Sequence, residues 1–563
     1  MHHTLIPLVL ALFTAIPTIA AAAGSVLLPA SGQTACYDSA GTPRACAGSG
    51  EDGETRAGVV WPAPRFVANG EAALTDQLTS LIWSRHANAP DINASAPFVC
   101  GVNAESDMSW QQALDFIACL NSNSYAGFSD WRLPNLNELE GMVNAGAPDP
   151  SGYLSANGFG LEGLATLVQP SGYWSSTSDA SFPDAAWDVN FLTGGLPFSS
   201  VKIPAVAGLD TRGVWPVRGV SSGAAPLAAT GQTSCFSASG AEISCAGSGQ
   251  DGEKLSGTPQ PVPRFKANAE GSFALDRLTG LIWPTTSRTP GPANPAPQGC
   301  AAAGSALDWQ QALDHTACLN RNSFLGTSGW RLPNRNEMRS LIDYSKSAPA
   351  LAAGHPFSDL SFGDTYWSST SDAGRPERAW TVNLFDGGLN ATGKSNGGIL
   401  SAWPVSGPDL LPPTVSITGG DLTVNVASRS IGGAMEAGST VAVAVNGGVP
   451  AAAAVDGESW SFTVQGLTAG ANAVTVTASD FSENQQSASL GITVLVPDGK
   501  LSGEAVVGIA DALLALRMFV GLIVPTPDQL LRGDVSPLGA PDGEVGLADT
   551  LMILRKAVGL ESF

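Results

Sequence analysis

Two stretches of the chain, residues 110–120 and 309–319, carry apolar residues at the spacing of an amphipathic helix. Ser109 and Asp308 stand directly before them, where a side-chain oxygen can accept a hydrogen bond from a free backbone N–H. The apolar positions of the first stretch include Trp110, Ala113, Leu114 and Ile117. The pattern therefore predicts two equivalent helices, each capped at its first turn.

Short runs of aromatic and β-branched residues, such as LIW, YWSSTS and AWDVNF, lie between turn-forming residues and predict short strands. Residues 412–496 show a different pattern, because Val, Thr and Ala alternate with a period of two in STVAVAVNG and NAVTVTASD. Turn residues separate these runs at roughly the 8–12-residue spacing that is typical of all-β proteins. This part of the chain is predicted to be a β-sandwich.

The chain repeats itself, with a first copy at residues 24–222 and a second at residues 223–408. The motif WRLPNLNEL of the first copy returns as WRLPNRNEM in the second. Each contains an asparagine followed three residues later by a glutamate, the pattern of a capping box at a helix start. The pairs are Asn135 with Glu138 and Asn334 with Glu337. We interpret the motif as a strand-to-helix joint with a buried tryptophan (Trp131 or Trp330), rather than as a catalytic signature.

The eight cysteines are divided equally between the copies, and their spacing repeats. No C-x-x-C and no recurring histidine accompanies them, which disfavours a zinc or redox site. An even, repeated set in an exported protein indicates structural disulfides. Four cysteines per copy allow three pairings, and we favour bonds between sequence neighbours. The predicted bonds are Cys36–Cys46, Cys100–Cys119, Cys235–Cys245 and Cys300–Cys318.

Composition narrows the function classes. The formal net charge is −22 and charged residues make up only 13% of the chain. Because nucleic-acid binders need clustered Lys and Arg to displace phosphate counterions, we exclude that class. Residues 1–23 combine an apolar stretch with an A-x-A cleavage pattern and predict a secretory signal peptide. No other stretch is apolar enough to span a bilayer, so we expect no transmembrane anchor in the mature chain.

Both copies contain LT–LIW, W–AL–CLN, WRLPN–NE, YWSST and AW–V–GG in the same order. This order resembles the C-terminal domain of Legionella collagen-like adhesins, the Lcl C-terminal family. The resemblance implies an α+β fold similar to C-type lectins and formylglycine-generating enzymes, and binding of carbohydrate or glycosaminoglycan at a bacterial surface.

Binding of a polyanion requires cations, which the second copy supplies better than the acidic first copy. The candidate ligand-binding residues are Arg331, Arg335, Arg339 and Lys346. The first copy has Leu136 and Glu140 in the helix instead. The alternative is a solvated helix face that binds nothing.

Two further domains follow. Residues 412–496 resemble bacterial Ig-like modules, notably in DGESWSFTVQGLTAGANAVTVTASD, and such modules serve as spacers. Residues 497–563 repeat ADALLALRMFVGL as ADTLMILRKAVGL and resemble a small α-helical dockerin, which implies a cohesin-like partner. Oxygen ligands at calcium-loop positions precede the second helix, with extra residues inserted, and predict a structural Ca²⁺ site. The predicted ligands are Asp534, Ser536, Asp542, Glu544 through its carbonyl, and Asp549. The first half of this repeat is degenerate and keeps only Asp498, Gly499 and Asp511.

The sequence assembles no recognisable catalytic centre. His86, His315 and His355 have no counterpart in the other copy, and nucleophile-elbow, zinc-protease and P-loop motifs are absent. We therefore expect a secreted or surface-associated, non-enzymatic, adhesin-like protein that binds an extracellular glycan or another surface polymer. Two alternatives stay open. One is a polysaccharide-degrading enzyme delivered by the dockerin-like tail, since glycoside hydrolysis needs only two suitably spaced carboxylates. The other is a purely structural surface protein.

Overall fold

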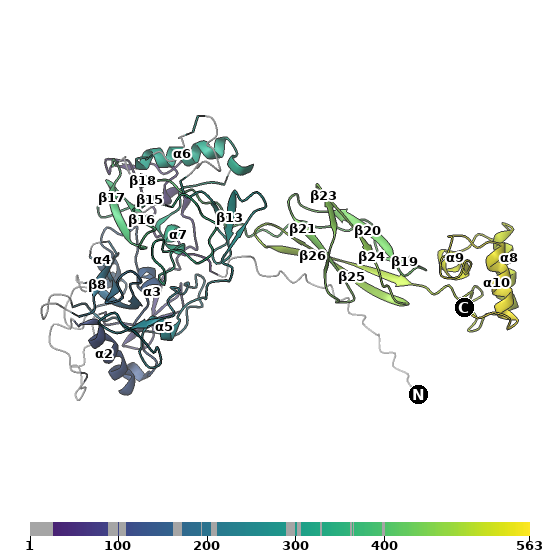
Figure 1. The fold of residues 1–563 in the computed structure, drawn as a ribbon, viewed down its shortest axis with the longest axis horizontal. Coiled ribbons are helices and arrows are strands. Elements are labelled where there is room, and N and C mark those ends of the chain that lie inside the picture. The colour runs from purple at the N-terminus through teal and green to yellow at the C-terminus, as the bar shows by residue number, and fades with distance from the viewer. Residues whose placement is uncertain are drawn as a thin grey trace, which may run out of the picture. The chain divides into compact units, whose positions relative to one another are not determined.

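The computed structural model describes residues 26–87, 100, 108–160, 172–192, 194–203, 211–288, 299–300, 306–326, 329–360, 363, 365–396 and 400–563. The predicted signal peptide lies outside these residues. Residues 23–409, which hold both copies of the repeat, form one compact unit, and residues 410–563 belong to a second (Figure 1). The boundary at residues 222 and 223 therefore separates two sequence copies but not two packing units. Every helix in the described part of the chain is too short or too polar to traverse a membrane.

The first copy combines small sheets with short helices. Its elements are β1 (Cys36–Tyr37), β2 (Pro43–Arg44), α1 (Asp52–Thr55), β3 (Phe66–Ala68), β4 (Ala73–Asp76), β5 (Ile82–Ser84), α2 (Trp110–Ser122), η1 (Tyr125–Gly127), α3 (Leu136–Gly141), α4 (Pro150–Ala156), β6 (Tyr173–Ser178), β7 (Ala185–Asn190), β8 (Leu196–Val201) and β9 (Val217–Arg218). They form the hairpin β1-β2, the sheet β3-β4-β5-β9 and the antiparallel sheet β6-β7-β8. The strands predicted from LIW, YWSSTS and AWDVNF are thus confirmed.

The second copy repeats this order closely. Its elements are β10 (Cys235–Phe236), β11 (Glu242–Ile243), α5 (Asp251–Lys254), β12 (Phe265–Ala267), β13 (Phe273–Asp276), β14 (Ile282–Pro284), α6 (Trp309–Arg321), η2 (Phe324–Gly326), α7 (Arg335–Ser340), β15 (Thr365–Ser371), β16 (Arg378–Asn383), β17 (Leu389–Gly393) and β18 (Leu400–Ser401). The sheets are β10-β11, β12-β13-β14 and β17-β16-β15-β18. Strand β18 pairs with β15 in parallel, whereas the other pairs are antiparallel.

The predicted caps start the main helices. Ser109 and Asp308 each accept a hydrogen bond from the backbone N–H of the glutamine three residues later, and that glutamine returns a bond to the cap. The side chains of Trp110 and Trp309, which follow the caps, are fully buried. Capping fixes where α2 and α6 begin, and the tryptophans fix which face turns inward.

The WRLPN motif is a scaffold, as predicted. Asn135 and Glu138 form a complete capping box at α3, and Trp131 is buried. The Glu138 carboxylate also binds both terminal nitrogens of Arg132, at 2.5 and 2.6 Å. The same arrangement recurs at α7 in the second copy, where Arg331 binds Glu337. Neither glutamate lines an open cleft, because both are buried against a helix start.

The N-terminal segment of each copy packs on the other copy. We name residues 29–57 and 228–256 the exchange segments. In the first direction, Asn334 donates its side-chain amide to the carbonyl of Ala57 at 3.0 Å, and Asn336 donates to Pro29 at 3.0 Å. Farther along, Thr370 in β15 donates to the buried carboxylate of Asp52 at 2.5 Å.

The reverse direction repeats these bonds. Asn135 donates to the carbonyl of Ser256 at 2.9 Å and Asn137 donates to Ala228 at 3.0 Å. Thr177 in β6 donates to the buried Asp251 at 2.7 Å. Gln33 and Gln232 also bond across, to the backbone of Ser371 and Ser178 respectively. The two asparagines of each WRLPN motif therefore receive the exchange segment of the opposite copy.

One hydrophobic core runs through both copies and includes Trp83, Trp215, Trp283 and Trp403. Smaller clusters lie beneath α2 and α6. The four disulfides have the predicted pairing, Cys36–Cys46, Cys100–Cys119, Cys235–Cys245 and Cys300–Cys318. Each bond closes within one copy, so the copies are joined by the backbone and by non-covalent contacts.

The second unit begins with two sheets that share a core, as the alternating pattern predicts. The sheets are β19-β26-β25-β21-β22 and β20-β24-β23, built from β19 (Leu422–Val424), β20 (Arg429–Ala434), β21 (Thr440–Val445), β22 (Ala451–Ala452), β23 (Ala454–Asp456), β24 (Ser459–Val464), β25 (Gly470–Ser479) and β26 (Gln485–Val494). Three helices follow: α8 (Ile509–Phe519), α9 (Pro527–Gly533) and α10 (Leu547–Ala557). Helices α8 and α10 are the two that the C-terminal repeat predicts.

Candidate functional site

A groove of about 290 Å³ lies between the two copies. One wall is helix α2 of the first copy, and the other is the part of the second exchange segment at residues 243–254. The groove is therefore built from both copies, and the reciprocal packing is what creates it. Its lining includes Gln111, Leu114, Asp115, Ile117, Ile243, Glu253 and Lys254.

The groove offers both hydrogen-bond donors and acceptors. Gln111 donates to the carboxylate of Asp115 at 3.0 Å, and both side chains are exposed on α2. Opposite them, the ammonium group of Lys254 lies 3.5 Å from the Glu253 carboxylate. Burial opposes ionisation of Glu253, but hydrogen bonds from the N–H groups of Gly249 and Gly247 outweigh it and lower the pKa of this carboxyl. Glu253 thus holds its loop in place as an anion.

Aliphatic side chains form the remainder of the lining. Leu114 and Ile117 are buried residues of α2, and Ile243 is 42% exposed on the opposite wall. The lining is thus divided about evenly between polar and apolar surface, and is more polar than that of most small-ligand sites.

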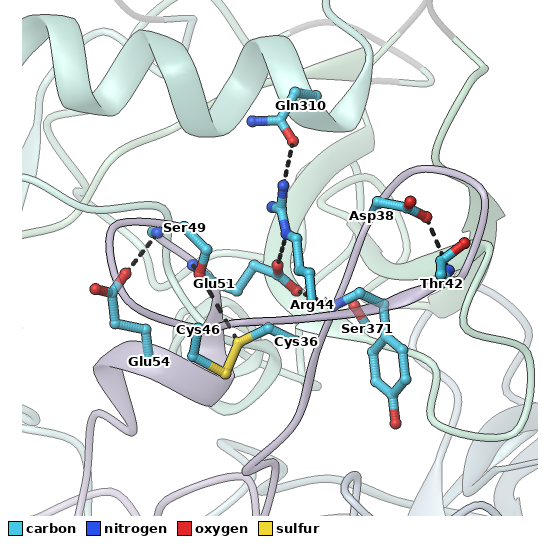
Figure 2. Close-up of polar contacts among 12 residues, drawn as sticks. Cys36, Asp38, Thr42, Arg44, Cys46, Ser49, Glu51, Glu54, Gln310 and Ser371 are labelled. Carbon is cyan, nitrogen blue, oxygen red and sulfur yellow. Dashed lines mark hydrogen bonds and ion pairs between the residues drawn. A yellow bond between two sulfur atoms is a disulfide. The ribbon is translucent and has the colours of Figure 1, made fainter.

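The equivalent position in the other half of the unit is crossed by an arginine (Figure 2). There the wall is α6, and the first exchange segment places Arg44 where the second has Ile243. Arg44 binds the Glu51 carboxylate at 2.7 Å and reaches the side-chain oxygen of Gln310 at 3.2 Å. Gln310 in turn donates to Asp314, as Gln111 does to Asp115. Arg44 therefore engages the side-chain oxygen of Gln310, whereas Asp314 stays exposed.

The predicted cationic ligand site is not a free surface, and that expectation is wrong. Arg335 is only 1% exposed and binds Glu140 of the first copy at 2.6 Å. Arg339 binds the same carboxylate oxygen at 2.8 Å, and Arg331 is paired with Glu337. Of the four predicted residues, Lys346 is exposed. Arg335 and Arg339 face the first copy instead of solvent, because α7 lies at the interface between the copies, and Arg331 is held within the second copy by Glu337 and the carbonyl of Gly407.

Sequence reasoning missed the groove. The pairing of the second exchange segment with α2 joins positions more than a hundred residues apart, which no local pattern reveals. A signal was present in the comparison of the copies, since the charged Arg44 aligns with the aliphatic Ile243 between cysteines of equal spacing.

The C-terminal module gathers three of the five predicted calcium ligands. Carboxylate oxygens of Asp534, Asp542 and Asp549 lie within 4.8 Å of one another. Burial, together with the neighbouring carboxylates of Asp549 and Asp542, raises the pKa of Asp534. Convergence of anionic oxygens that repel one another is the donor set that a hard divalent cation favours. For the other two predicted ligands, Ser536 and Glu544, the structure gives backbone bonds to Asp549 and Asp542.

The first half of this module differs at one ligand. Leu501 and Ser502 donate their N–H groups to Asp511, just as Val535 and Ser536 donate to Asp549. The residue that precedes Leu501 is Lys500, whereas the residue that precedes Val535 is Asp534. A cation therefore stands in the first half where the second half has an acidic ligand.

No curated protein matches the chain. Among solved structures, the fibronectin(III)-like modules of CbhA from Clostridium thermocellum are 19% identical, cover 21% of this chain and 60% of their own, and have a TM-score of 0.15. The twitchin kinase region from C. elegans is 13% identical, covers 15% and 16%, and has a TM-score of 0.13. A polysaccharide lyase is 16% identical, covers 20% and 18%, and also has a TM-score of 0.13. TM-scores this low establish neither fold nor function.

The family comparison is decisive. The Lcl C-terminal domain matches residues 72–218 and again residues 272–406, which together make up half of the chain. Both matches begin after the exchange segments and contain the WRLPN motif, the capped helices and the tryptophan core described above. The protein belongs to the Lcl C-terminal domain family and carries two tandem domains of that family within one compact unit.

Proposed function

We propose that this protein is a secreted or cell-surface, non-enzymatic binding protein that recognises extracellular carbohydrate through the groove between α2 and residues 243–254. The observation that carries the proposal is the open groove itself, with polar groups on both walls and an aliphatic floor. Membership of the Lcl family and four disulfides, which are typical of oxidising compartments, support the location. We also propose that each copy has a fold similar to that of C-type lectins.

The groove favours a neutral sugar over a sulfated polyanion. A polyanion site needs unpaired cations, whereas the three candidate arginines of the second copy, Arg331, Arg335 and Arg339, are used in ion pairs. The groove instead places the acids Asp115 and Glu253 beside Lys254. Sugar hydroxyls both donate and accept hydrogen bonds, so they suit the amide of Gln111 and the carboxylate of Asp115. The C–H face of a sugar ring would lie against Leu114 and Ile243.

A glycan array with the full chain tests this proposal. The variant Gln111→Ala/Asp115→Ala removes the polar pair of the open groove, and Gln310→Ala/Asp314→Ala makes the same changes at the position that Arg44 crosses. We expect the first variant to lose about tenfold or more in affinity, and the second to bind like the wild type. Equal losses in both variants would contradict the assignment to this groove. Release of sugar products would favour a polysaccharide-degrading enzyme, and absence of any binding would favour a structural role.

In the second unit, we infer that residues 412–496 are an Ig-like spacer and that residues 497–563 are a dockerin-like module that binds one Ca²⁺. Asp534, Asp542 and Asp549 would hold the ion, which would neutralise their mutual repulsion and fix the loop before α10. Calorimetric titration of the full chain with Ca²⁺ should give one site, which Asp534→Asn/Asp542→Asn abolishes. The matched control Asp498→Asn, in the degenerate half, should leave that site intact. Two sites, or none, would refute this assignment.

A cohesin-like partner for this module is also proposed. Residues 38 positions apart in its two repeats form matching apolar pairs, and both members of every pair are exposed. The pairs are Ile509 with Leu547, Leu513 with Leu551, Leu516 with Leu554, Val520 with Val558 and Leu522 with Leu560. Leu551 and Leu554 lie in α10 and Val558 follows it directly, at the spacing of one helix face. Because the two faces match, Leu513→Ser/Leu516→Ser and Leu551→Ser/Leu554→Ser should each spare the binding of purified cohesin modules, and only their combination should abolish it.

A further inference from the structure

Three charged residues meet at the interface between the copies. Glu140 ends α3 of the first copy, and one of its carboxylate oxygens accepts hydrogen bonds from Arg335 at 2.6 Å and from Arg339 at 2.8 Å. Glu140 is 3% exposed, and the guanidinium carbon of Arg335 lies 4.2 Å from the ring centre of Trp380. Buried charges of this kind are tolerated only when they are paired.

At this cluster the two copies differ in charge. Leu136 and Glu140 occupy in α3 the positions that Arg335 and Arg339 occupy in α7, counted from the capping asparagine of each helix. If two first copies were paired, Glu140 would face Leu136 and a second Glu140. If two second copies were paired, four arginines would meet without an acid. Both arrangements bury uncompensated charge, which is strongly unfavourable.

The exchange segments distinguish the copies only weakly. The bonds of the motif asparagines and of the buried aspartates recur in both directions: Asn334 to Ala57 and Asn135 to Ser256, or Thr370 to Asp52 and Thr177 to Asp251. The bond from Arg44 to Gln310 is made in one direction, but its acceptor is a neutral amide that the first copy also has, at Gln111. They supply attraction between any two copies, like or unlike. Specificity requires an element that penalises the wrong pair, and the charge cluster is such an element.

We propose that Glu140, Arg335 and Arg339 determine which copies pair. A copy that carries an acid on this helix selects a copy that carries two arginines there, and the reverse also holds. The selected copy can belong to the same chain or to a second chain. The inference concerns assembly of the unit and stands whether or not the groove binds sugar.

The two copies can be separated without breaking a disulfide. Val220 in the connection is 76% exposed, and none of the four disulfides spans it. A protease site inserted after Val220 in the full chain would therefore leave two halves that are held together only by non-covalent contacts. Gel filtration and sedimentation of the cleaved chain under non-reducing conditions then measure how tightly unlike copies bind.

The decisive variant is Arg335→Leu/Arg339→Glu, which gives the second copy the residue types of the first. We expect its cleaved halves to bind at least about thirtyfold more weakly than wild-type halves. The control Arg321→Leu/Lys346→Glu makes the same change in charge at two exposed positions of the second copy and should leave binding unchanged. Glu140→Gln, which keeps the side-chain shape, provides a second variant that should also weaken pairing.

Transposing the pattern gives the sharpest result. Leu136→Arg/Glu140→Arg combined with Arg335→Leu/Arg339→Glu places the arginines in the first copy and the acid in the second, and should restore pairing. The proposal is overturned if wild-type halves separate, if Arg335→Leu/Arg339→Glu pairs as tightly as the wild type, or if the control separates equally. Failure of the transposed chain to regain pairing would also overturn it, because charge complementarity would then not be what decides.

Discussion

The groove at α2 and the equivalent position at α6 are built from matching parts but differ in the residue that faces the helix. Each has a Gln–Asp pair on a capped helix and a glutamate that ties down the facing loop, at Glu253 in one and Glu54 in the other. In the groove at α2 Ile243 leaves a space of about 290 Å³, whereas at α6 Arg44 spans from Glu51 to Gln310. The Gln–Asp pair and the loop glutamate, which build the walls, are therefore the same in both copies. The residue that faces the helix, Ile243 or Arg44, is not.

The largest expected effect tests the part that both copies share. Glu138→Ala and Glu337→Ala each leave an arginine without its carboxylate and remove an acceptor from the helix cap. We expect each to lower the free energy of unfolding by about 3–5 kcal/mol, measured by chemical denaturation. The loss should be larger in the first copy, because the side chain of Arg132 is 10% exposed against 18% for Arg331. A loss under about 1 kcal/mol in either copy would contradict a structural role for the motif.

The intermediate effect is a pH dependence of stability that arises from the two buried aspartates of the exchange segments. It tests whether the two segments contribute equally. Burial raises the pKa of Asp52 and of Asp251 to about 6, from an ordinary value of 3.8. The folded state therefore favours the protonated acid. Its stabilising contribution is complete below about pH 4 and is lost as the pH rises through about 6.

Asp52→Asn and Asp251→Asn should therefore each stabilise the protein at pH 7.5, by roughly 1–3 kcal/mol. The gain should shrink toward zero at pH 4.5, and thermal melts at both pH values check it. Variants that destabilise equally at both pH values would show that these carboxylates do not titrate as described. A difference between the two variants would show that the two directions of exchange are unequal.

The smallest expected effect concerns only the access of a ligand to the groove, and it depends on the proposed sugar site. Ile243→Arg should place a guanidinium against Gln111, as Arg44 lies against Gln310. The affinity for a glycan that the array identifies should fall about tenfold, close to 1.4 kcal/mol. Arg44→Ile should do the reverse and raise the number of sites per chain from one to two in a calorimetric titration. Ile243→Val keeps an aliphatic wall and serves as the control. Unchanged stoichiometry in Arg44→Ile would show that the second position differs by more than its arginine.

Local features could be predicted from the sequence, because their causes lie within a few residues. The caps at Ser109 and Asn135, the buried Trp131 and the bond between Cys36 and Cys46 all follow from short spacings. The three converging carboxylates of the C-terminal loop follow from spacing in the same way. These elements position most of the core.

Contacts between distant segments could not be predicted in this way. Arg335 and Arg339 have the spacing of an exposed basic face, and nothing within their own helix reveals that Glu140, about 200 positions earlier, neutralises them. Asn137 and Asn336 carried the one available hint, since each recurs in its motif without a role in its own cap. Their partners lie in the opposite exchange segment, which leaves no periodic trace in the sequence.

The reciprocal packing of the exchange segments has an evolutionary consequence. A gene that lost either repeat would encode an exchange segment without the surface that binds it, and a binding surface without its segment, so the deletion would be selected against. Duplication within such a chain is therefore hard to reverse. Once the two copies have diverged in charge, each depends on the other and they are inherited together.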